Sequence, residues 1–243
     1  MASALRFNHV TKTFAHRAGQ MLLRDRLLDL ARPSKRRSRF EALTDVSFAL
    51  EAGESLGLIG ANGAGKSTIL NLATGLSLAD QGSIDVSGRV TALLELGAGF
   101  HYDLTGAENL RVNAAMMGMT RQQVAERFES IVEFSGVREF LDEPMRVYSA
   151  GMTVRLAFSV AVAADPDVLL VDEVLGLGDQ QFYAKCLGKI REFQSLGKTI
   201  VLASHSTELI TMLCQRVLWL EKGRVKMEGG AEEVVAAYKA SAA

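Results

Sequence analysis

Residues 60–67 read Gly-Ala-Asn-Gly-Ala-Gly-Lys-Ser, which matches the phosphate-loop pattern GxxxxGK[ST] at every fixed position. A short buried strand is predicted before this loop, at 54–60, and a helix follows from about 65 to 76. The glycines let backbone N–H groups fold around phosphate oxygens, and the helix directs its N-terminal dipole at the same charge. A chance glycine turn is the alternative, but it does not account for both flanks. The sequence therefore predicts a nucleoside triphosphate site whose contacts are Gly60, Ala61, Asn62, Gly63, Ala64, Gly65, Lys66, Ser67 and Thr68.

Within this loop the last residues carry separate roles. The ammonium group of Lys66 is placed to bridge the β- and γ-phosphates, and the hydroxyl of Ser67 is placed to bind Mg²⁺.

A second motif, with two acidic residues, follows the short apolar run VLLV at 168–171. There Asp172 is predicted to hold Mg²⁺, and Glu173 to act as the general base that polarises the attacking water. The alternative for both carboxylates is a cap on the next turn.

Strands and helices alternate along the chain, which predicts an α/β fold with a largely parallel sheet. We expect an edge strand at 5–10 and a half-buried strand at 43–50. The pattern is helical throughout 105–164, and this block predicts an inserted second lobe.

Composition limits which kinds of partner and cellular compartment the sequence predicts. The 243 residues carry 27 basic and 28 acidic side chains, so no overall field favours nucleic acid. The two cysteines, Cys186 and Cys214, lack metal-binding or CxxC spacing, which favours a reduced, cytosolic chain. Cys186 is interpreted as a small buried hydrophobe. No apolar run reaches the roughly 18–20 residues of a membrane span, and the N-terminus lacks the features of a signal peptide. Work at a membrane would therefore need a membrane-embedded partner.

Together with the phosphate loop and the acidic strand end, the segment YSAGM at 148–152 indicates a family. The chain resembles the ATP-binding subunit of ABC transporters over essentially its whole length. The segment lies where that family carries its LSGGQ signature. The resemblance implies that Ser149, Ala150 and Gly151 close over the γ-phosphate bound by a second copy, so that hydrolysis needs a homodimer. Taken alone, Ser149 could simply be a helix N-cap.

Other family positions can be carried over one by one. His205 resembles the histidine that contacts the γ-phosphate and the attacking water, although a structural histidine after a strand is the alternative. Asp179 occupies the place of a residue that touches the opposing subunit. Phe14 resembles the aromatic residue that stacks on adenine; Phe40 is a rival for this role, and a core or edge-strand position suits either ring equally well. Glu95 falls near the position of a glutamine that gives a second Mg²⁺ contact, or it is a surface acid at a strand end.

The resemblance extends to one branch of the family. The stretches LLELGAGF, LTGxEN and DEVLGLGDxxFxxKC look like the polysaccharide-exporting ATPases, which move lipid-linked O-antigen, teichoic acid or capsule glycans. The implied fold is a P-loop NTPase of ABC type: a mostly parallel core sheet with an antiparallel β edge and an inserted α-helical lobe. It implies a single domain over 1–243, with a core of about 1–95 and 166–243 and a lobe of about 96–165. We expect a C-terminal carbohydrate-binding domain to be missing or supplied by another protein.

A basic insertion at about 15–40 separates the first two predicted strands and holds eight Arg or Lys residues. It is interpreted as a solvated loop, as a contact with anionic lipid or an acidic partner surface, or as a nucleic-acid arm, and the net charge does not support the last of these.

The resulting prediction is an ATPase that uses ATP and Mg²⁺, forms a homodimer and pairs with an integral membrane permease dimer. It would act at the cytoplasmic face of the bacterial inner membrane to export a lipid-linked glycan and would bind no nucleic acid. Rival functions are a soluble ABC ATPase that remodels ribosomes or DNA, and the import of a small solute.

Overall fold

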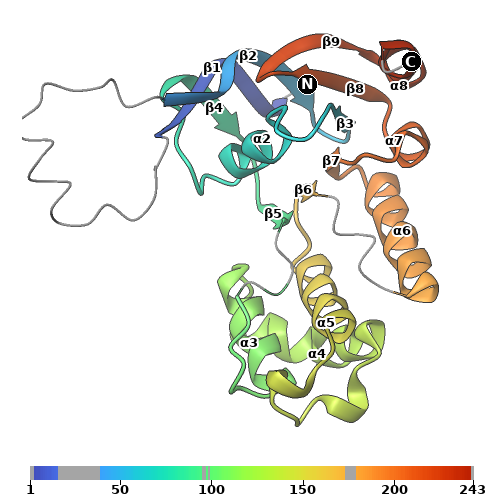
Figure 1. Cartoon of the computed structure of the whole chain (residues 1–243). Coiled ribbons are helices and arrows are strands. Elements are labelled where there is room, and N and C mark those ends of the chain that lie inside the picture. The colour runs from blue at the N-terminus through green and yellow to red at the C-terminus, as the bar shows by residue number, and fades with distance from the viewer. Residues whose placement is uncertain (1–2, 16–38, 95–96, 98, 173–178, 242–243) are drawn as a thin grey trace, which may run out of the picture.

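The centre of the molecule is a mixed sheet of mostly parallel strands (Figure 1). The computed structural model describes residues 3–15, 39–94, 97, 99–172 and 179–241. Within these residues the sheet has six strands, of which only the last runs antiparallel to its neighbour. In spatial order they are β5 (Val90–Leu93), β6 (Val168–Val171), β7 (Thr199–Ala203), β3 (Ser55–Ile59), β8 (Arg216–Glu221) and β9 (Arg224–Gly230). The predicted parallel sheet with an antiparallel edge is thus confirmed.

A second, antiparallel sheet consists of β2 (Arg39–Glu51), β1 (Ser3–Ala15) and β4 (Gln81–Val86), in that order. The prediction of an edge strand at 5–10 is wrong, because β1 pairs with β2 on one side and with β4 on the other. The alternation of side chains in one strand reports which face is buried, whereas strand neighbours are decided by distant segments. The half-buried character predicted for 43–50 is confirmed by the alternating burial of β2.

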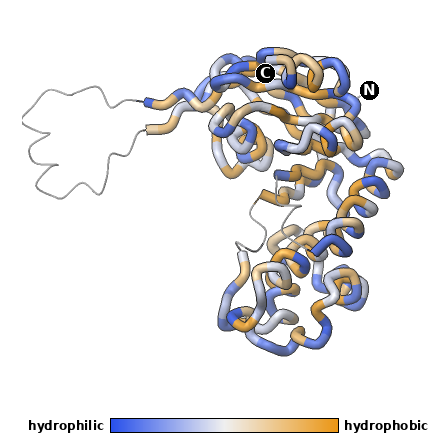
Figure 2. Tube along the Cα trace, turned by 45° about the vertical axis from the view of Figure 1, so that its right-hand side comes forward, coloured by the Kyte–Doolittle hydropathy of each residue, from blue (hydrophilic) through white to orange (hydrophobic). Residues whose placement is uncertain are grey.

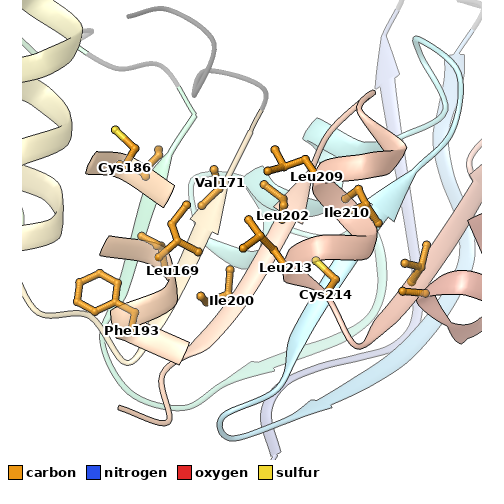
Figure 3. Close-up of a cluster of buried hydrophobic side chains, with 14 of the residues drawn as sticks. Leu169, Val171, Cys186, Phe193, Ile200, Leu202, Leu209, Ile210, Leu213 and Cys214 are labelled. Carbon is orange, nitrogen blue, oxygen red and sulfur yellow. The ribbon is translucent and has the colours of Figure 1, made fainter. Parts of the chain in front are cut away.

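Each strand of the central sheet contributes to two apolar layers. Along β6, Leu169 and Val171 pack on one face with helices α6 (Gln180–Ser195), α7 (Thr207–Leu213) and α8 (Ala231–Ser241) (Figure 3). Val168 and Leu170 pack on the other face, with the antiparallel sheet and helix α2 (Lys66–Ala73). Figure 2 shows the consequence as apolar stretches along the central strands and alternating polar and apolar residues along α6.

Both cysteines belong to the first of these layers (Figure 3). Burial raises the pKa of each thiol, Cys186 and Cys214, to about 12. The interpretation of Cys186 as a small buried hydrophobe is therefore confirmed.

A helical lobe lies apart from the two sheets and has its own apolar core (Figure 1). The lobe contains α3 (Gly106–Met116), α4 (Arg121–Ser135) and α5 (Ala150–Ala163), with short 3₁₀ turns at Arg138–Phe140 and Met145–Val147. Local sequence sets where two of these helices begin, since Thr105 with Glu108 and Thr120 with Gln123 form reciprocal capping boxes. Among the helices that the structure describes, none combines the length and apolarity needed to cross a bilayer.

Candidate active site

The candidate site lies at the carboxyl edge of the central sheet. Strands β6, β7 and β3 are parallel neighbours, so the residues that follow them meet at one edge. A cavity of about 250 Å³ opens there. Its lining comes from all three strand ends and from the β1–β2 hairpin: Phe14, Phe40, Ala42, Asn62, Gly63, Ala64, Gly65, Lys66, Ser67, Thr68, Asp172 and His205.

The phosphate loop requires glycine at two points where the chain passes close to other backbone. Gly60 has φ +147°, and a Cβ there would lie 2.3 Å from the carbonyl oxygen of Leu220. Gly65 has φ +111°, and its Cβ would meet the side chain of Leu43 and the carbonyl oxygen of Ala42. A side chain at either position would collide with these neighbours and strain the backbone.

Lys66 is held at the start of α2 with its ammonium group turned back into the loop. Its Nζ donates to the carbonyl oxygens of Gly60 at 2.7 Å and Ala61 at 3.3 Å. These two predicted nucleotide contacts therefore act here through their carbonyls on the lysine, while residues 62–68 line the cavity. Lys66 is only 7% exposed, and burial lowers its pKa, partly offset by the negative charge of Asp172. A buried ammonium group in a glycine loop at the start of a helix is suited to an anionic ligand, whose negative charge would add to that of Asp172.

The loop and the acidic strand end meet directly. The hydroxyl of Ser67 donates to Oδ2 of Asp172 at 3.1 Å, across 105 positions of sequence. A hydroxyl and a carboxylate at this separation are oxygen donors of the kind that Mg²⁺ prefers, usually with several waters retained. The residues present therefore fit Mg²⁺, with Ser67 and Asp172 as the groups that would hold it.

His205 follows β7 and lines the same cavity. Its pKa is lowered by burial and by the positive charge of Lys66, against an opposing effect of Asp172. The imidazole is thus neutral at pH 7, where one ring nitrogen can donate a hydrogen bond and the other can accept one. The next residues fix its position, since Ser206 caps α7 by accepting from the backbone N–H of Leu209.

The structure places both candidate aromatic residues at the cavity. Phe14 and Phe40 are direct partners across β1 and β2, and both line the opening near the phosphate loop. The sequence offers them as alternatives for one role, stacking on adenine, whereas the pairing of β1 with β2 sets them side by side.

The signature segment lies elsewhere, at the start of α5 in the helical lobe. Ser149 caps this helix by accepting from the backbone N–H of Met152 at 3.2 Å. Within a single chain, Ser149 is therefore the helix N-cap that the sequence offered as an alternative. A Cβ on Gly151 would find only ordinary contact with Ser149 Oγ, at 3.9 Å. None of the described residues 149–151 lines the phosphate-loop cavity of the same chain.

Asp179 caps α6, accepting from the backbone N–H of Phe182 at 2.8 Å. Its other oxygen lies 3.5 Å from Nη1 of Arg155 on α5. This ion pair joins the start of α6 to the signature helix α5. Arg155 and Ala42 are site neighbours that sequence reasoning missed. A signal for Arg155 was its position one helical turn after Gly151, on the same side of α5.

Three predictions fall on residues outside those that the structure describes. They are the general base Glu173, the second Mg²⁺ contact Glu95, and the basic insertion, most of which lies at 16–38. Their roles remain predictions from the sequence.

Gly60→Ala tests the close approach of the loop to β8. We expect a loss of about 2–4 kcal/mol in the free energy of unfolding, because the new Cβ meets backbone rather than a flexible side chain. Urea unfolding followed by circular dichroism measures it. Gly63→Ala is the matched control: its φ of +77° also disfavours a side chain, but a Cβ there meets nothing within 4 Å, so about 1–2 kcal/mol is expected. Equal losses for the two variants would contradict the packing argument.

Comparison with known proteins places these motifs in a family. Residues 43–176, more than half of the chain, match the family model described as ABC transporter. The O-antigen export system ATP-binding protein RfbB of Klebsiella pneumoniae is 43% identical over 243 residues, which cover 98% of each chain. The teichoic acids export ATP-binding protein TagH of Listeria monocytogenes is 40% identical over 96% of this chain and 68% of its own length.

Solved structures show the same fold at lower identity. A structure of the ATP-binding subunit of an ABC transporter superposes with a TM-score of 0.77 at 22% identity, over 97% of this chain and 93% of the other. A dimeric ATP-binding cassette in a post-hydrolysis state, bound to ADP and Pi, superposes with a TM-score of 0.74 at 19% identity, over 93% and 98%. The chain therefore belongs to the ABC transporter family, as an ATP-binding subunit of the branch that includes the O-antigen and teichoic acid export ATPases.

Proposed function

We propose that this protein hydrolyses ATP to drive export of a lipid-linked polysaccharide through a membrane permease, with O-antigen as the favoured cargo and teichoic acid or capsule glycan as others. The observation that carries the ATPase is the contact between Ser67 and Asp172 beside Lys66. The cargo is inferred from the 43% identity to an O-antigen export protein over nearly the whole chain. The departures from the usual import ATPases, at residues 93–109, favour export over uptake of a small solute.

The residues of the cavity divide the chemistry of phosphoryl transfer among them. Lys66 and the loop N–H groups bind the triphosphate and offset the charge that develops on the γ-phosphate. Mg²⁺, held by Ser67 and Asp172, would supply further charge neutralisation when bound. Glu173 orients and deprotonates the attacking water, and the neutral imidazole of His205 contacts the same water or the γ-phosphate. Little covalent work is left to the protein.

Two copies are proposed to complete the site. Ser149, Ala150 and Gly151 do not line the phosphate cavity of their own chain, yet they form an exposed helix start with room for a ligand. In the proposed dimer this segment closes on the γ-phosphate held by the partner's loop. Asp179 lies near the same interface, where its pairing with Arg155 links the two lobes. Closing on ATP and opening after hydrolysis would be the motion passed to the permease.

The permease is proposed to dock on the helical lobe. Between α3 and α4 lies an apolar groove of about 680 Å³ whose lining includes Val112, Ala115, Met119 and Phe128. Charged residues also line it, among them Arg111, whose guanidinium lies 4.7 Å from the centre of the Phe128 ring. A short amphipathic segment of the permease, apolar on one side and charged at its ends, matches this lining.

Ala115→Glu tests the docking groove. The exposed alanine lines the groove, so a charged side chain there is expected to reduce copurification with the permease at least tenfold while leaving ATP binding unchanged. Ala240→Glu, which adds the same side chain to an exposed position of α8, is the control and should copurify normally. Normal recovery of the Ala115→Glu complex would exclude this groove as the docking site.

The cargo is tested in cells whose only copy of this protein carries Glu173→Gln. We expect lipid-linked glycan to accumulate on the cytoplasmic side, where it can be isolated and identified. Normal surface glycan would refute polysaccharide export and leave a soluble remodelling ATPase or a solute importer as the alternatives. Cell fractionation distinguishes the two alternatives. Recovery of the protein with membranes only when the permease is co-expressed would support a peripheral transporter subunit over a soluble ATPase.

A further inference from the structure

The strands β1 and β2 carry two phenylalanine pairs that have opposite environments. Phe7 and Phe48 stack with ring centres 4.7 Å apart and are 2% and 6% exposed. Phe14 and Phe40, also direct cross-strand partners, are 46% and 52% exposed. The first pair belongs to the core of the antiparallel sheet. The second leaves two large apolar rings in water at the mouth of a cavity, which is a costly arrangement for a side chain with no other role.

The path of β2 brings Phe40 toward the phosphate loop. Lys12 pairs with Leu43 and Thr13 with Glu41, so Ala42 is an extra residue on β2 and forms a bulge. The bulged residue lies against the loop, because a Cβ on Gly65 would come within 2.9 Å of the carbonyl oxygen of Ala42. Phe40, two residues earlier on the strand, lines the same cavity as Ala42 and Gly65.

Strand β1 is held in place by hydrogen bonds at the residues just before Phe14. The backbone N–H and the hydroxyl of Thr13 both donate to Oδ2 of Asp80, at 2.6 and 2.8 Å, and these bonds lower the pKa of that carboxyl. The Nζ of Lys12 lies 5.4 Å from the centre of the Phe14 ring and donates to the carbonyl oxygen of Leu78. Phe14 therefore has a cation on one side, and the pairing of the strands sets Phe40 beside it.

We infer that Phe40 is a second base-contacting residue, so that the adenine of bound ATP lies against both Phe14 and Phe40. The inference rests on the proposed binding of ATP at the loop of Gly60–Ser67, and it adds a residue and a geometry to that site. A base has flat apolar faces that stack on aromatic rings whatever its hydrogen-bonding edge. Two rings from two strands make the base site depend on the pairing of β1 with β2.

Binding measurements on the full chain test this inference. We expect Phe40→Ala and Phe14→Ala each to raise the dissociation constant for ATP by about 5- to 20-fold, the usual range for loss of one stacked ring. Binding of inorganic tripolyphosphate, which has no base, should stay within twofold for both variants. Phe40→Tyr should bind ATP like the original chain, whereas Phe40→Leu should resemble Phe40→Ala, because the flat ring and not the apolar volume makes the contact. Tyr102→Ala, which removes an exposed aromatic side chain outside the cavity, is the control.

The outcomes separate the inference from the proposed function. Unchanged ATP affinity in Phe40→Ala, with weakened binding in Phe14→Ala, would overturn the inference and leave the ATPase untouched. Equal weakening of tripolyphosphate binding would also overturn it, since the variant would then have disturbed the phosphate loop. Failure of the original chain to bind either ligand would instead contradict the proposed ATP site.

Discussion

Lys66→Ala is expected to raise the dissociation constant for ATP by about 10- to 150-fold and to abolish turnover. The ammonium group is buried against the carbonyl oxygens of Gly60 and Ala61 and faces the cavity, so it supplies a charge-assisted contact to phosphate worth about 1.5–3 kcal/mol. The loss in turnover is larger than the loss in binding, because the same charge stabilises the transition state. Equilibrium binding and phosphate release measure the two effects separately.

Thermal unfolding provides a second measurement of the same variant. ATP stabilises the chain that binds it by RT ln(1 + c/Kd), where c is the ATP concentration, so at one fixed ATP concentration the rise in Tm should be clearly smaller in Lys66→Ala, in step with its raised dissociation constant. Without nucleotide two effects of the substitution oppose each other, since it removes a desolvated charge and also the hydrogen bonds to Gly60 and Ala61, so the Tm of the free variant is the baseline for its ATP shift. Lys198→Ala is the control. It removes a lysine paired with Asp165 and Asp167 at the opposite edge of the sheet, and its ATP-induced shift should persist. A normal ATP shift in Lys66→Ala would refute the role of Lys66 in phosphate binding.

Glu173→Gln is expected to lower ATP turnover by about 10²- to 10⁴-fold while ATP still binds. The amide keeps the size of the side chain but cannot accept the proton of the attacking water, and this is the contribution of a positioned general base. Unhydrolysed ATP should then hold two copies together, which size-exclusion chromatography with light scattering detects as an ATP-dependent dimer. Glu192→Gln, which changes an exposed carboxylate on α6 paired with Lys189, should turn over normally. Turnover above a few per cent in Glu173→Gln would contradict the general-base assignment.

The interpretation of local features from the sequence was largely sufficient for the fold. Patterns of about ten residues predict the phosphate loop, the cap by Ser149 as one alternative, and the alternation of strands and helices. The capping boxes of α3 and α4, which the structure shows, are equally local. Such features depend on neighbours within one or two turns, so the information lies in the segment itself. The order of motifs along the chain was also enough to indicate the family, which the 43% identity to an O-antigen export protein supports.

The sequence predicted a shared Mg²⁺ role for Ser67 and Asp172, but it did not specify most other contacts between distant segments. The prediction of an edge strand at 5–10 was wrong because the pairing of β1 with β4 joins residues between 70 (Thr11 and Gln81) and 81 (Leu5 and Val86) positions apart. The sequence predicts Phe14 and Phe40 as rivals, whereas the pairing of β1 with β2 sets them opposite each other. The pairing of Asp179 with Arg155 within one chain is likewise visible only in the structure, and the contact of Asp179 with a second copy stays a prediction.

The sequence by itself thus determined the elements and the chemistry available to this protein: a phosphate loop, an acidic strand end and a second glycine-containing helix start. Only the tertiary structure decided which of these groups meet within one chain. It joins Ser67 to Asp172 and leaves residues 149–151 outside that cavity. The physical reason is that helix caps and strand alternation come from short-range sterics and hydrogen bonds, whereas the meeting of groups 105 positions apart depends on strand order and on burial of both faces of the sheet.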